Sequence, residues 1–136
     1  MSQAGNVLET DIDDVIAAVC RLAFDSYALG SVSPAQLVDR SGYRRHRDEV
    51  TVARLADCLT EHPDWANAWL DYSEDKRSSP GWYIQGRDPD ESRVGYYEGE
   101  SSRAPMRFDD KVRACAEFVR LEVDDIAGLN RNPSSR

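Results

Sequence analysis

The sequence lacks the features that mark exported and membrane-spanning chains. No apolar run approaches the length needed to cross a bilayer. The first residues, Met1–Glu9, have no basic segment leading into an apolar one, which argues against a secretory signal. Three widely spaced cysteines are odd in number, which is typical of reduced thiols and not of a disulfide framework. We therefore expect a cytoplasmic protein that does not enter a membrane.

Familiar catalytic and cofactor motifs are also missing. There is no GxGxxG, P-loop, GxSxG, HExxH or EF-hand sequence. The sequence contains two histidines, His46 and His62, and neither is separated from a Cys, Asp or Glu by a spacing typical of metal ligands. Cys20, Cys58 and Cys115 each fall at or beside an apolar helix face, where a core role is the more frequent one. We therefore predict a protein that is not an enzyme and that holds no cofactor or metal.

The charge balance points to the kind of partner. The 136 residues fit one domain over 1–136, with frayed termini at about 1–6 and 130–136. The net charge is −8, and segments 1–30 and 65–100 each carry −4 of it. Such a field repels nucleic acid and anionic membranes and attracts basic proteins. We therefore expect a protein partner, with no nucleic acid and no membrane.

Apolar residues at three- and four-residue steps predict about four N-terminal helices. Thr10 is a suitable cap for the first, which runs to Gly30. Ser33-Pro34 with Gln36 predicts a capped second helix ending at Gly42, and Thr51 or Asp48 starts the third. The expected helical regions are 10–30, 33–42, 51–62 and 63–77, with a polar loop over 43–49.

After the turn at 78–81 the periodicity changes to that of strands. Trp82–Ile84 and Val94–Tyr97 are aromatic and β-branched, and Met106–Phe108 is a third short candidate. Asp109 then caps a long last helix that Gly128 closes. The predicted fold is α+β, with N-terminal helices, a small antiparallel sheet of two or three strands, and a long C-terminal helix.

Two charged features have simple structural explanations. Adjacent acidic pairs are frequent, but most lie at predicted helix ends or on polar faces, as ordinary solvated side chains do. A basic cluster between two helices suggests a helix-turn-helix regulator, although its connection is longer than the usual turn and acidic residues flank it. The cluster consists of Arg40, Arg44, Arg45, His46 and Arg47. DNA binding is therefore the weaker alternative.

The segment Trp65–Tyr83 concentrates aromatic and charged residues. It holds all three tryptophans and two tyrosines within 19 residues, beside Asp71, Glu74 and Asp75. Part of it must supply the core, but aromatic anchors beside charged groups are also what interface hot spots are made of. We interpret this segment as both core and binding surface.

Within this segment the sequence resembles small bacterial immunity proteins, which are encoded beside polymorphic toxins such as those of contact-dependent inhibition. The likeness is in Tyr72–Arg77 and Gly81–Tyr83, and it extends over roughly residues 33–123. Supporting positions are Ser33-Pro34, Leu37, Ser41–Tyr43, His62-Pro63, Trp69, Phe108-Asp109 and Ala114–Ala116. The resemblance implies a cytoplasmic inhibitor that binds and neutralises a cognate toxin domain. It carries no catalytic residue set.

The sequence therefore predicts an immunity protein that binds a basic toxin domain, possibly a nuclease, through an acidic and aromatic surface. A small enzyme with an unrecognised site is the alternative from another class, and a helix-turn-helix regulator is the third. The predicted partner contacts lie between Asp71 and Glu100. They are Asp71, Glu74, Asp75, Asp88, Asp90, Glu91, Tyr96, Tyr97 and Glu98.

Overall fold

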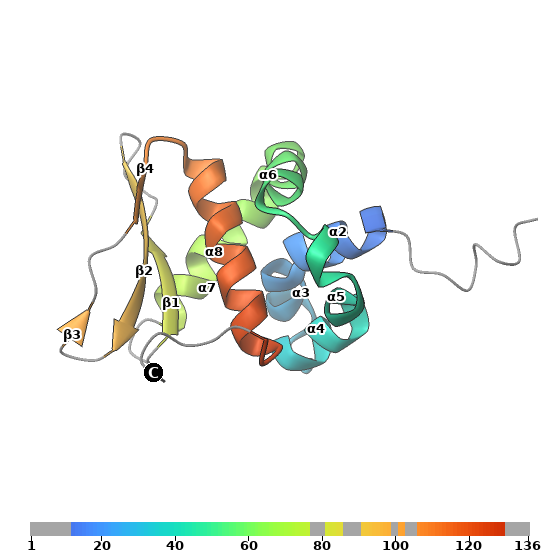
Figure 1. The fold of residues 1–136 in the computed structure, drawn as a ribbon. Helices are drawn as coiled ribbons and strands as arrows, with labels where there is room; N and C mark the ends of the chain where they lie inside the picture. Colours follow the sequence, from blue (N-terminus) through green and yellow to red (C-terminus); the bar gives the residue numbers. More distant parts are fainter. Residues whose placement is uncertain (1–11, 77–80, 86–90, 99–100, 103–105, 130–136) are drawn as a thin grey trace, which may run out of the picture.

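A computed structural model describes residues 12–76, 81–85, 91–98, 101–102 and 106–129. These residues form an α+β fold, with the helices first, then an antiparallel sheet, then a long last helix, as the sequence predicts. The sheet packs on α7 (Pro63–Lys76) and α8 (Lys111–Ile126), and the other helices lie on the opposite side of α8 (Figure 1). The two helices α7 and α8 therefore form the middle of the molecule.

The N-terminal helices are more numerous than the four predicted. The expected first helix divides at Arg21 into two, and the expected loop 43–49 is a short helix followed by a 3-10 turn. The loop prediction was wrong because Tyr43 is fully buried and fixes this segment to the core. Before α7 the described elements are α2 (Ile12–Cys20), α3 (Leu22–Leu29), α4 (Pro34–Ser41), α5 (Tyr43–His46), η1 (Arg47–Glu49) and α6 (Val52–Glu61).

Side-chain caps set several helix starts. Ser33 and Gln36 form the expected capping box at α4, in which each side chain accepts a backbone N–H of the other residue. Thr51 accepts the amide of Arg54 at 3.2 Å and begins α6. At α8 the cap is Asp110 and not Asp109, one residue later than predicted. The Asp110 carboxylate accepts the backbone N–H groups of two residues in the first turn. Asp109 precedes the N-cap position by one residue and does not make these bonds.

The described sheet contains four strands but is three strands wide, because two short strands share one edge. β1 (Gly81–Gln85) pairs antiparallel with β2 (Ser92–Glu98), with Ile84 opposite Val94. The other edge of β2 is shared by β3 (Ser101–Ser102) and β4 (Met106–Phe108), which pair with different ends of it. On this pairing Gly95 lies opposite Tyr83, and a Cβ at position 95 would stand 2.6 Å from the Tyr83 hydroxyl oxygen. Glycine is therefore required there for the tyrosine ring to lie across β2.

The free edge of β1 is covered by α7. The buried hydroxyl of Ser73 accepts the amide of Ile84 at 2.9 Å and donates to its carbonyl oxygen at 3.1 Å. An exposed edge strand offers unpaired backbone groups to other chains. Ser73 satisfies one such pair of groups, and it thereby joins the sheet to the helical layer.

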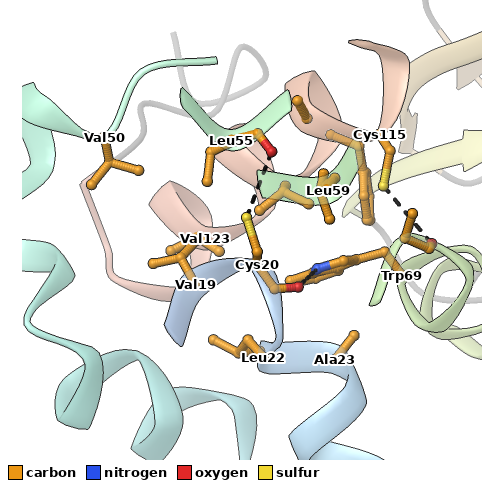
Figure 2. Packing of buried hydrophobic residues seen from close by; sticks show 14 of the residues in the cluster. Val19, Cys20, Leu22, Ala23, Val50, Leu55, Leu59, Trp69, Cys115 and Val123 are labelled. Atoms are coloured by element: carbon orange, nitrogen blue, oxygen red, sulfur yellow. Dashed lines mark hydrogen bonds between the residues drawn. The ribbon is translucent and has the colours of Figure 1, made fainter. Parts of the chain in front are cut away.

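Trp69 on α7 organises the core between the layers. It is fully buried, and its indole N–H donates to the carbonyl oxygen of Cys20 at 2.7 Å (Figure 2). Its ring packs edge-on against Phe118 of α8, with 5.8 Å between ring centroids. Leu55 and Leu59 of α6 are also fully buried in the cluster that Figure 2 draws. One tryptophan thus contacts the end of α2 and the middle of α8.

A buried carboxylate holds the 43–49 segment against α8. Asp124 is 3% exposed and accepts a hydrogen bond from the Tyr43 hydroxyl. It also accepts two hydrogen bonds from the Arg47 guanidinium, one from Nε at 2.8 Å and one from Nη2 at 3.0 Å. Arg120, one turn earlier on α8, donates to the same carboxylate at 3.2 Å and to the carbonyl oxygen of Val50 at 2.8 Å. The negative charge is therefore compensated twice, as a buried carboxylate requires.

Candidate protein-binding face

Three of the predicted contact residues lie together on α7. Asp71, Glu74 and Asp75 are exposed, and their spacing of three and four residues places them on one side of the helix. Asp88 and Asp90 lie outside the described residues, as do the side chains of Tyr97 and Glu98, whose backbone belongs to β2. Three of the seven acidic residues among the predicted contacts thus lie together on α7.

Helix α3 leaves three large hydrophobic side chains exposed, which the sequence prediction missed. Phe24, Tyr27 and Leu29 are 40%, 49% and 53% exposed, although each is a large hydrophobic residue. They are three of the five large hydrophobic side chains that are exposed among the described residues. Phe24 and Tyr27 are three residues apart and share one side of α3, whereas Leu29 lies far around the helix from both. Neighbouring exposed apolar side chains mark interaction sites more often than scattered ones do. The available signal was that apolar residues occur all round the 22–29 segment, so one helix face cannot bury them all.

A hydrogen bond joins the apolar helix to the acidic one. The hydroxyl of Tyr27 donates to Asp75, and α3 packs along α7. Partial burial of its hydroxyl end, this hydrogen bond and the charges of Asp75, Asp71 and Glu74 together raise the pKa of Tyr27 above its usual value. The three carboxylates are therefore close enough to act on one phenol. We call this surface the acidic–aromatic face, and it consists of Phe24, Tyr27, Asp71, Glu74 and Asp75.

Glu91 and Tyr96, the other two predicted contacts whose side chains are described, lie at the sheet and not on this face. Glu91 forms ion pairs with Arg93 at 3.2 Å and with Arg107 at 3.4 Å, so two cations offset its charge. Tyr96 is 6% exposed, and its ring packs edge-on against Trp82 between the sheet and the helices. The stretch that the sequence presents as one surface is thus divided by the fold between α7 and the sheet.

The basic cluster between α4 and α6 is largely paired internally. Arg44 lies 3.5 Å from Asp39, and Arg47 is committed to Asp124. His46 contacts Glu49 at 3.1 Å. The cluster borders a shallow hollow lined by Arg44, Arg45, His46, Arg47, Asp48, Glu49 and Leu129. The acids in this hollow reduce the positive field that a phosphate backbone would need.

Potential metal ligands are dispersed in the described part of the chain. There, no three or more His, Cys, Asp or Glu side chains gather as a metal site would require. His62, the second histidine, stacks on Trp65 with 3.7 Å between ring centroids. Arg21 lies over the same tryptophan at 5.8 Å, so this end of α7 is an arrangement of packed rings and a cation.

Comparison with known proteins supplies no identity. No protein-family model matches the chain, and searches of curated proteins and of solved structures found no match. None of the described helices combines the length and apolar character that crossing a bilayer needs. The candidate function therefore rests on the surface itself and on the resemblance in the sequence.

Proposed function

We propose that the protein is an inhibitor that binds a basic protein domain through the acidic–aromatic face. The observation that carries this proposal is the Tyr27–Asp75 contact, which places an exposed aromatic side chain of α3 beside three exposed carboxylates. Apolar anchors surrounded by charged groups are the arrangement that concentrates binding energy at protein interfaces.

Charge determines which partner this face suits. The chain carries a net charge of −8, and Asp71, Glu74 and Asp75 add a local negative field around the exposed side chains of α3. A partner with arginine or lysine side chains around an apolar pocket would be attracted before contact and held after it. The rings of Phe24 and Tyr27 would fill that pocket.

The resemblance to immunity proteins specifies the partner further. On that basis the partner is a toxin domain, possibly a nuclease, because a domain that binds nucleic acid presents a basic surface. Inhibition then requires only that the acidic–aromatic face cover this surface in the cytoplasm. The inhibitor itself performs no chemical step.

The test is protection of growing cells. We expect a toxin-type reading frame beside the gene. The chain is co-expressed with the C-terminal domain that this reading frame encodes, and growth is measured. We expect the parent to protect and two variants to lose protection: Asp71→Arg/Glu74→Arg for the acidic half and Phe24→Ala/Tyr27→Ala for the aromatic half. The matched control is Asp57→Arg/Glu61→Arg, which changes the net charge equally at two exposed positions of α6.

Circular dichroism of each variant must first show parental helix content. Loss of protection by the control and the face variants alike would show that bulk charge, not this face, is responsible. Full protection by both face variants, or the absence of any toxin-type reading frame beside the gene, would contradict the proposal.

A further inference from the structure

The sheet has an outer face that is turned away from the helices. In Figure 1 the helices lie on one side of β1, β2 and β4, and the sheet packs on α7 and α8. Ile84 and Val94 are buried opposite each other and define the inner face. Because side chains alternate between the two faces of a strand, their neighbours lie on the outer face. We call three of these the basic sheet face, which consists of Tyr83, Arg93 and Arg107.

Two arginines stand directly opposite each other on this face. Arg93 of β2 pairs across the strands with Arg107 of β4, and their side chains are 44% and 69% exposed. Like charges at such cross-strand positions destabilise a sheet. The carboxylate of Glu91 lies 3.2 Å from Nε of Arg93 and 3.4 Å from Nε of Arg107, so it offsets one of the two cations. One positive charge is therefore left over among these three residues.

Both guanidinium groups keep unused hydrogen-bond donors. Arg93 donates to Glu91 through Nε, and within the described residues the Nη groups of Arg93 and Arg107 have no hydrogen-bond partner. A guanidinium fork binds a carboxylate through two parallel N–H···O bonds. The basic sheet face therefore fits a surface that presents carboxylates.

Tyr83 adds an aromatic surface beside the arginines. Its hydroxyl oxygen would stand 2.6 Å from a Cβ at Gly95, so the ring lies over the backbone of β2 at that glycine. Gly95 is two positions from Arg93 and thus belongs to the same face. Aromatic rings pair favourably with other rings and with arginine side chains. The partly exposed Tyr83 ring therefore extends the face from charged to aromatic contacts.

The same chain carries a surface that complements this one. The acidic–aromatic face offers exposed carboxylates and two exposed rings, Phe24 and Tyr27. Carboxylates of one face would pair with the arginines of the other, and Tyr83 would pack against these rings. The two faces of one chain cannot meet, because α7 packs on the inner side of the sheet. A long polyanion such as nucleic acid fits less well, since the net charge of −8 repels it.

We propose that the basic sheet face binds the acidic–aromatic face of a second copy of the chain. The contact joins two different surfaces, so it is head-to-tail and leaves one face of each kind free at the ends. Further copies can therefore add, which a symmetric dimer does not allow. The contact also covers the acidic–aromatic face, so self-association competes with a basic partner. Only this competition rests on the proposed function; the self-association does not.

Sedimentation equilibrium of the purified full chain measures the association. The weight-average mass of the parent should rise at least about 1.5-fold between about 20 μM and 1 mM, because a small interface of charged groups binds weakly. Arg93→Glu/Arg107→Glu and Asp71→Arg/Glu74→Arg should each stay monomeric over this range. An equimolar mixture of the two variants should associate again, because each protein keeps the face that the other has lost.

The matched control for the sheet variant is Arg54→Glu/Arg113→Glu. It changes the net charge equally at two exposed positions, one on α6 and one on α8, and it should associate as the parent does. Circular dichroism of each variant must first show parental helix content. The measurement on the parent needs no variant, so a poorly folding variant does not decide the result.

Several outcomes would overturn the proposal. The first is a parent that stays monomeric throughout, and the second is an α7 variant that associates as the parent does, which would indicate a sheet-to-sheet contact. A monomeric parent that binds a labelled single-stranded oligonucleotide through Arg93 and Arg107 would assign the face to nucleic acid instead. A monomeric chain that still protects cells would refute this inference and leave the proposed function intact, whereas association without protection would do the reverse.

Discussion

Replacing Asp124 with alanine removes the acceptor on which Tyr43, Arg47 and Arg120 converge. The phenol of Tyr43 would be left fully buried without its partner, which costs about 1–3 kcal/mol. The side chains of Arg47 and Arg120 are 35% and 22% exposed, so water can partly replace their lost contacts. Breaking a buried pair costs about 3–5 kcal/mol, and this residual exposure favours the lower end, about 3 kcal/mol.

Urea unfolding followed by tryptophan fluorescence measures this loss, because Trp69 is buried in the native core. With a denaturant dependence of about 1.5–2 kcal/mol/M, the Asp124→Ala midpoint should fall by about 1.5–2 M. The matched control is Asp39→Ala, which removes an exposed ion pair with Arg44 and should cost about 0–1 kcal/mol. Equal midpoints for the two variants would refute the view that Asp124 anchors the 43–49 segment.

Two further predictions concern stability. Ser73→Ala leaves the amide and carbonyl of Ile84 unpaired and should lower the free energy of unfolding by about 1–3 kcal/mol. Hydrogen exchange at the Ile84 amide should accelerate, and an unchanged exchange rate would contradict this role of Ser73. Burial and contacts with carboxylates raise the pKa of Tyr27, Tyr43 and Tyr72. The protonated phenols therefore stabilise the folded state fully below about pH 10, the usual tyrosine pKa, and this stabilisation is lost as the pH rises further. The Tyr43→Phe/Tyr72→Phe variant should therefore lose less stability than the parent between about pH 9 and 11, and equal losses in urea midpoints would contradict it.

The sequence predicted correctly those helix starts and strands that are determined by residues close together in the chain. The Ser33–Gln36 capping box, the Thr51 cap and the aromatic strands depend on residues a few positions apart, and each appears where expected. The 43–49 segment was different, because its helical turns are held by Tyr43 and Arg47 reaching Asp124, about 80 positions away. A polar, arginine-rich stretch gives no local sign of such a partner.

The candidate face likewise combines residues that the sequence predicted with residues that only the tertiary structure shows. Asp71, Glu74 and Asp75 were predicted from the sequence as part of an acidic and aromatic stretch, and α7 places them on one side of a helix. Phe24 and Tyr27 were not, since they sit among apolar residues that the periodicity assigns to the core. Only the packing of α3 along α7 shows which of those residues remain outside.

The salt dependence of association tests the central claim most directly. The rate constant for binding the adjacent toxin domain is measured between 50 and 500 mM NaCl, for the parent, for Asp71→Arg/Glu74→Arg and for the α6 control Asp57→Arg/Glu61→Arg. If the acidic–aromatic face meets a basic surface, the parent rate falls about tenfold or more over this range, and the α7 variant shows less than about half of that slope. The α6 control should keep a slope close to the parental one. Equal slopes for the two charge-reversed proteins would contradict the assignment of this face.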